Sequence, residues 1–118
     1  MHLAENMRQY GIHVLTQSKY NRNRHIEFSS SSKSMNKKEL HQVISHSIME
    51  PCKIIEQLSI EQFEKYYSIQ GFKLTGVSVA VHISEHLSYH VGQVGVITKM
   101  ISDKDLEFYA GLNLNITD

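Results

Sequence analysis

Histidine recurs every four residues in one part of the chain, at His82, His86 and His90. Apolar residues around them recur at helical spacing, so we expect this segment to be a helix. Two neutral imidazoles one helical turn apart can bind a single divalent metal ion. Three cannot, because a rise of about 1.5 Å per residue places the outer two about 12 Å apart. At most one adjacent pair therefore chelates an ion, and the third histidine has another role.

The position of each histidine around the helix selects the pair. An advance of about 100° per residue from Ile83 places His90 about 20° and His86 about 60° from the axis of the apolar stripe. His82 falls about 100° from that axis. The stripe consists of Val79, Ile83, Leu87, Val94, Ile97 and Ile101. This pattern predicts that His86 and His90 face the interior and that His82 lies at the edge.

A metal site also needs a third ligand from elsewhere in the chain. The candidates are His2, His13, His25, His41 and His46. His41 and His46 fall off the apolar stripe of the second expected helix, and His25 lies in a basic loop. His2 and His13 share one side of the first expected helix, and spacing does not choose between them. A purely structural role for the histidines, as hydrogen-bonded core residues, also stays open.

The elements that position these residues are mostly helical. We expect one long helix over residues 1–18 and another from residue 76 to about 100 or 101, both with apolar residues at helical spacing. The polar stretch 19–32 is typical of a loop.

The middle of the chain carries a further long helix and a shorter extended segment. The helix is expected to begin near Ser34 or Asn36, and Pro51 predicts a kink or break because it removes a backbone donor. Ser59 begins a capping-box pattern that predicts a short helix. Residues 66–74 are rich in β-forming types and predict a small hairpin or an extended loop.

Composition limits the classes of function. The 118 residues suit a single domain, and the 12 basic and 12 acidic residues leave no excess charge that would favour nucleic acid or an acidic membrane surface. The lone Cys52 excludes an internal disulfide and is compatible with a reducing compartment. No signal peptide and no apolar run of about 20 residues is visible. We therefore expect a soluble cytoplasmic protein.

Three segments carry a resemblance to a known family. Residues 86–93 (HLSYHVGQ), followed by 97–99 (ITK) and 104–109 (KDLEFY), resemble the closing helix of the DinB-like superfamily. The likeness is strongest to a branch described as a domain of unknown function, related to the YfiT-like thiol transferases. Residues 2–7 (HLAENM) resemble the segment with that family's first ligand histidine. Residues 22–28 (RNRHIEF) resemble the Arg-x-Arg-x-x-Glu-Phe loop that follows it.

This resemblance implies a metal site and an activity. Members of the superfamily form a four-helix bundle that binds a divalent ion, often nickel or zinc, through one histidine of the second helix and two of the last. The matching ligands here are His2, His86 and His90, and His82 has no ligand role. The implied activity is metal-dependent transfer of a low-molecular-weight thiol onto an electrophile. The alternatives are a metal-dependent hydrolase and a non-catalytic bundle that only binds metal or dimerises.

The chain departs from the family in one respect. Members carry a further helix before the first ligand histidine, whereas this sequence begins at that histidine. We therefore expect one all-α domain over residues 1–118, a DinB-like up-down bundle reduced to about three long helices and a short extended segment. Such a remnant exposes an apolar groove, which favours a homodimer.

Overall fold

The computed structural model of the chain describes residues 1–28 and 35–115. Helix α1 (His2–Arg8) continues into the π-helical segment η1 (Gln9–Val14), and the chain then passes through the short helix α2 (Arg24–Phe28). The remaining elements follow in the order α3 (Lys37–Glu56), α4 (Ile60–Glu64), β1 (Tyr66–Ile69), β2 (Phe72–Thr75) and α5 (Gly76–Ser102).

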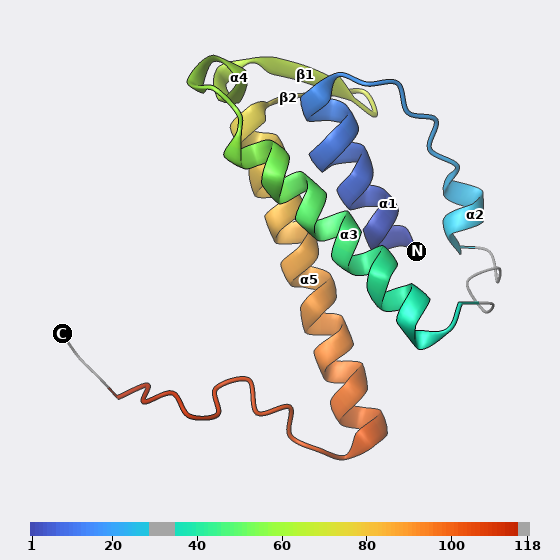
Figure 1. Ribbon diagram of the computed structural model, residues 1–118, viewed down its shortest axis with the longest axis vertical. Coiled ribbons are helices and arrows are strands. Elements are labelled where there is room, and N and C mark those ends of the chain that lie inside the picture. Colours follow the sequence, from blue (N-terminus) through green and yellow to red (C-terminus); the bar gives the residue numbers. More distant parts are fainter. Residues whose placement is uncertain (29–34, 116–118) are drawn as a thin grey trace.

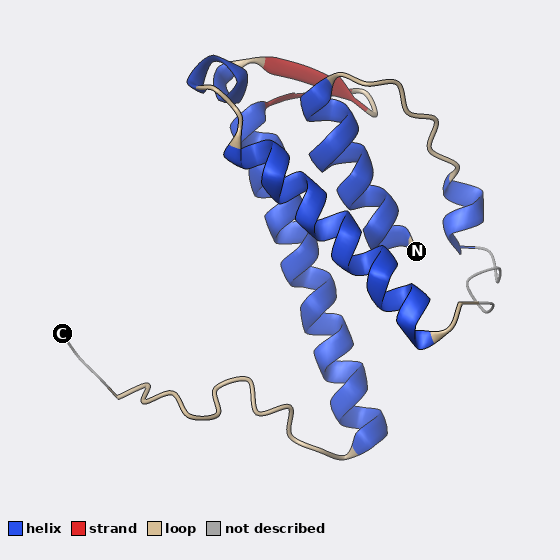
Figure 2. Cartoon of the chain, viewed as in Figure 1, coloured by secondary structure: helices blue, strands red, loops and turns tan. Residues whose placement is uncertain are grey.

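The expectation of an all-α fold is wrong, because β1 and β2 pair as an antiparallel sheet (Figure 2). Tyr66 pairs with Thr75 and Ile69 with Phe72, which confirms the hairpin rather than the extended loop over 66–74. Gln70 and Gly71 both have positive φ, at 50° and 83°, as a two-residue hairpin turn requires. Alternate residues of β1 are buried, so the strand packs one face against the helices.

Side-chain caps set where the helices begin. Asn36 accepts a hydrogen bond from the backbone of Glu39 and forms a capping box, which confirms the later of the two predicted starts for α3. Ser34 lies outside the described residues. Ser59 caps α4 as predicted, and Thr75 caps α5 by accepting from the backbone of Ser78.

Helix α3 runs through Pro51, so a break at this residue is wrong, whereas the alternative of a kink stays a prediction. The proline ring is buried against η1, where an added Cβ on Gly11 would lie only 2.5 Å from Pro51 Cβ. The glycine thus allows close helix packing, and this burial offsets the backbone hydrogen bond that proline cannot donate. The predicted loop over 19–32 is also interrupted, because α2 forms one helical turn within it.

Helix α1 with η1, helix α3 and helix α5 form the body of the molecule, and the hairpin lies across one end (Figure 1). Helix α1 and helix α5 run antiparallel, so the start of α1 lies beside the middle of α5. The buried core lies between the helices and the hairpin and consists of Met7, Tyr10, Leu15, Tyr67, Ile69, Val79 and Ile83. Among the described residues, no helix is both long and apolar enough to cross a membrane.

Candidate metal site

His2, His86 and His90 meet at the crossing of α1 and α5. One ring nitrogen from each lies within 4.8 Å of the other two. The ring centroids are 5.2 Å apart for His2 and His86, 5.6 Å for His2 and His90, and 4.7 Å for His86 and His90. We call these three residues the histidine trio. The structure therefore brings together the three histidines that the sequence proposed.

Two members of the trio present nitrogen atoms without a hydrogen-bond partner. Nε2 of His86 and Nε2 of His90 are both buried, and neither has a partner among the described residues. Leaving a buried polar atom unpaired costs about 1–3 kcal/mol, so such atoms call for an explanation. A metal ion would supply one, since the imidazole nitrogen is a common metal ligand.

The surroundings of His86 favour the protonation state that a metal needs. Burial, helped by the neighbouring His90 and His2, lowers the pKa of His86 to about 4. At neutral pH this imidazole is therefore uncharged, with a lone pair free to bind a cation.

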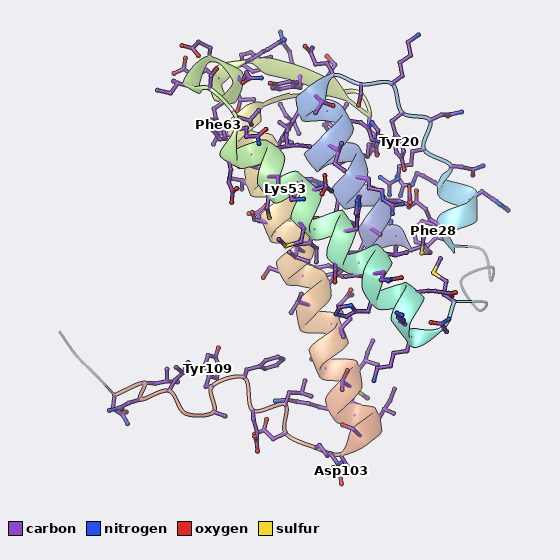
Figure 3. The ribbon with its side chains drawn as sticks, in the orientation of Figure 1. Tyr20, Phe28, Lys53, Phe63, Asp103 and Tyr109 are labelled. Atoms are coloured by element: carbon purple, nitrogen blue, oxygen red, sulfur yellow. The ribbon has the colours of Figure 1, made fainter. Side chains whose placement is uncertain are left out.

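A buried carboxylate orients His2. Nδ1 of His2 lies 3.1 Å from Oε2 of Glu27 and 3.2 Å from Nη2 of Arg22. In the tautomer with the proton on Nδ1, this atom donates to the carboxylate and the lone pair stays on Nε2. The ring also stacks on Phe28, with centroids 5.0 Å apart, and Figure 3 places Phe28 next to the start of α1. A histidine held by a carboxylate in this way is typical of metal ligands.

Arg22 holds Glu27 in place. Its Nε donates to Oε1 of Glu27 at 2.5 Å and its Nη2 to Oε2 at 2.7 Å, a bidentate pair whose side chains are almost fully buried. The hydrogen bonds from Arg22 lower the pKa of Glu27 despite its burial, so the carboxyl stays charged. Arg22 also donates to Oε1 of Gln9 at 2.8 Å, which ties the segment before α2 to η1.

The resemblance placed Glu27 in a loop after the first ligand histidine but gave it no contact with that histidine. The Arg22–Glu27 pair is present, while Arg24 is exposed. The available signal was the Arg-x-Arg-x-x-Glu-Phe pattern directly after the first ligand histidine.

His82 is not at the edge, contrary to prediction. Its Nε2 is as buried as those of His86 and His90 and has no partner among the described residues. Its ring lies against Tyr10 of η1, with centroids 4.1 Å apart, and burial lowers its pKa. One turn along α1 from His2, Asn6 is only 6% exposed, and its Oδ1 is likewise unpartnered. The periodicity of a single helix did not predict that His82 and Asn6, on different helices, would both have buried polar atoms.

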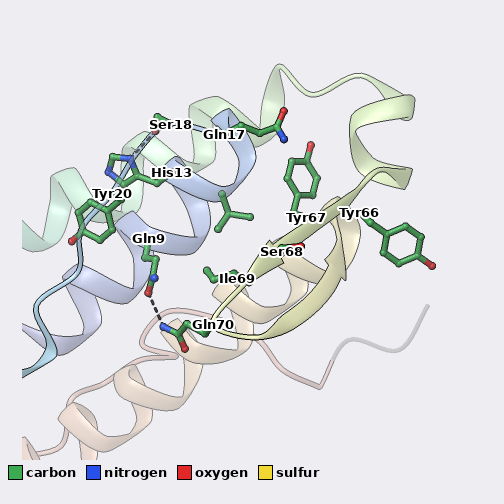
Figure 4. A pocket seen from close by; sticks show the side chains of 11 residues that line it. Gln9, His13, Gln17, Ser18, Tyr20, Tyr66, Tyr67, Ser68, Ile69 and Gln70 are labelled. Carbon is green, nitrogen blue, oxygen red and sulfur yellow. Dashed lines mark hydrogen bonds between the residues drawn. The ribbon is translucent and has the colours of Figure 1, made fainter.

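The other histidines lie apart from the trio. His13 accepts from or donates to Ser18 at 2.7 Å and stacks on Tyr20, with centroids 4.3 Å apart, in a separate pocket of ≈ 500 Å³ beside the hairpin (Figure 4). The side chains of His25, His41 and His46 are exposed. The structure thus selects His2 over His13, a choice that spacing left open. Cys52 is exposed and does not join the trio.

A comparison with protein families assigns the chain to a family. A family model described as protein of unknown function (DUF1572) matches residues 1–111. The chain belongs to this family. The stretch matched to DUF1572 includes the whole histidine trio and Glu27, and it confirms the expected relation to a domain of unknown function. Neither the curated proteins nor the solved structures that were searched give a match. Metal binding itself stays a prediction.

Proposed function

We propose that this chain is a DinB-like protein that binds one divalent metal ion through His2, His86 and His90. The observation that carries the proposal is the convergence of three imidazoles from two helices, two of them with buried, unpartnered Nε2 atoms. The contact from Glu27 to His2 supports it, because a proton on Nδ1 can be donated to the carboxylate while Nε2 keeps the lone pair that a ligand needs.

The donor set favours nickel or zinc over calcium or magnesium. All three donors are imidazole nitrogens, whereas calcium and magnesium prefer oxygen ligands. Glu27, whose carboxylate contacts His2, is paired with Arg22, and the guanidinium charge offsets the carboxylate charge. An ion held here would keep nearly its full positive charge.

We further propose that the protein transfers a low-molecular-weight thiol onto an electrophilic substrate. When bound, the ion would lower the pKa of a coordinated thiol toward neutrality. The thiol would lose its proton to solvent, and its sulfur would form a bond to the electrophilic carbon of the acceptor. The bond from that carbon to its leaving group would break, and the leaving group would depart with the electron pair. Arg22 and Glu27 hold His2 in the ligand orientation, while burial on α5 keeps His86 neutral.

We place this activity in the cytoplasm. The lone exposed Cys52 fits a reducing compartment, where low-molecular-weight thiols are available as co-substrates.

Two measurements test the proposal in sequence. After loading with nickel or zinc and desalting, elemental analysis should give about one ion per chain. No retained ion in either case would contradict the metal site. The loaded protein is then assayed for conjugation of small thiols to chromogenic electrophiles, with metal-free protein as the control. Bound metal without metal-dependent conjugation would overturn the transferase and support the non-catalytic bundle.

A further inference from the structure

An apolar groove of ≈ 680 Å³ opens beside the histidine trio. It lies where the start of α1, the first half of α3 and the middle of α5 face one another, and His2 and His90 form part of its wall. Other wall residues used below are Ile44, Ile48, Leu87 and Val94. No charged side chain lines it among the described residues.

The segment after α5 supplies another part of the wall. Leu106 and Phe108 line the groove and fold back onto α5 at Gly95, which is buried. A Cβ on Gly95 would lie 3.7 Å from the ring of Phe108 and 3.9 Å from Cδ1 of Leu106. Three helices and a returning segment therefore contribute to the wall, while side chains such as Val94 and Phe108, 62% and 63% exposed, leave the groove open to solvent.

We propose that this groove binds the apolar part of the electrophilic substrate, an alkyl chain or an aromatic ring, whose reactive end faces His2 and His90. This inference rests on the proposed function. The volume lies in the range of small-molecule sites, and a wall of aliphatic and aromatic side chains with polar groups at one end is typical of them. An acceptor with a charged tail would lose its hydration without gaining a partner.

The observation that favours a small molecule over a second copy of the chain is that two members of the trio line the groove. A protein surface seated there would cover both histidines and block access to the ion. A substrate with one reactive end and one apolar end would contact the histidines with the first and the apolar wall of the groove with the second.

A matched pair of probes tests this on the full chain loaded with Co²⁺, whose visible spectrum reports ligand binding. Acetohydroxamic and octanohydroxamic acid share the metal-binding group and differ by six methylenes. Each buried methylene strengthens binding by about fourfold, so we expect the octyl probe to bind at least 100-fold more tightly. Equal affinities on Co²⁺-loaded protein would overturn the groove while leaving the metal site intact.

Two valines of α5 provide matched variants. Val94 lines the groove and Val96 does not, yet they are 62% and 60% exposed. Val94→Asp should reduce the preference for the octyl probe at least tenfold, and Val96→Asp should leave it within threefold of wild type. Both variants should keep the Co²⁺ affinity within threefold. A preference unaffected by Val94→Asp would overturn the assignment.

A failure of the proposed metal site can be told apart from a failure of the groove. If Co²⁺ does not bind, the metal site is wrong, and the groove is tested on metal-free protein by methyl NMR with octanohydroxamic acid. Shifts confined to Leu87, Val94 and their groove neighbours support the groove, and their absence overturns it. A dimer that Val94→Asp dissociates, and that the octyl probe does not, would assign the groove to a second copy of the chain.

Discussion

Oε2 of Glu27 lies 3.1 Å from Nδ1 of His2, although 25 residues separate them in the chain. Arg22 fixes the same carboxylate through two hydrogen bonds. The segment that ends in α2 therefore contacts the proposed metal site through the ring of His2, and none of its described residues belongs to the histidine trio.

Replacing Glu27 tests this positioning role. Glu27→Gln keeps the side-chain shape but removes the charge and the bidentate acceptor for Arg22, so His2 loses its fixed orientation. Loss of such a partner typically weakens metal binding about 10- to 100-fold. Calorimetry with Zn²⁺ measures the change. Glu50→Gln, which alters only an exposed pair with Lys53, is the control. Unchanged affinity in Glu27→Gln would show that the carboxylate has no such role.

Single alanine variants test which histidines of α5 bind the metal ion. His86→Ala and His90→Ala should each abolish tight metal binding, because they remove a ligand of the trio. His82→Ala should retain most of the affinity, since this residue lies outside the trio and contacts Tyr10. Metal titrations on folded variants, checked by circular dichroism, measure the three values. An equal loss from His82→Ala would mean that the chelating pair is misassigned.

Asn6 offers a test through stability. Its Oδ1 is buried without a partner among the described residues, so Asn6→Leu removes an unpaired polar group and keeps a similar volume. We expect the free energy of unfolding to rise by about 1 kcal/mol. Asn36→Leu removes the cap of α3 and should lower it by about 1 kcal/mol. Urea denaturation measures both. Destabilisation by Asn6→Leu would indicate that its amide makes a needed hydrogen bond.

The pKa of His86 predicts how the metal-free protein responds to acid. Its folded-state pKa is about 4, against an ordinary value of 6.5, so between these pH values the unfolded chain binds the proton first. The contribution of His86 to stability is therefore complete above pH 6.5 and declines as the pH falls toward 4. Urea denaturation of wild type and His86→Leu across this window isolates the effect. Wild type should lose more stability than the variant, and parallel curves would contradict the shifted pKa.

Much of the secondary structure could be predicted from the sequence, because local residues determine where a helix begins. Asn36, Ser59 and Thr75 are side-chain caps that can be identified without knowing any neighbour. Pro51 shows the limit of such reasoning, because its cost is offset by packing on Gly11, a residue forty positions away. The hairpin was visible as a local pattern, but the assignment to an all-α class ignored it.

For the candidate site, too, the features within one helix could be predicted, and those that depend on contacts between elements could not. Periodicity placed His86 and His90 on the inner side. The same stripe is buried at Val79 and Ile83 but exposed at Ile101, so the period of one helix does not show which part of it is covered. His82 was misplaced because Tyr10, on another element, covers it. The choice of His2 over His13 depends on how α1 crosses α5, which spacing alone does not contain.

The most direct test of the metal site is anomalous diffraction from crystals of the zinc-loaded protein, recorded on both sides of the zinc absorption edge. The structure predicts one strong peak about 2.0–2.1 Å from a ring nitrogen of each of His2, His86 and His90. No anomalous peak among these three side chains, or a peak beside other histidines such as His13, would contradict metal binding by the histidine trio.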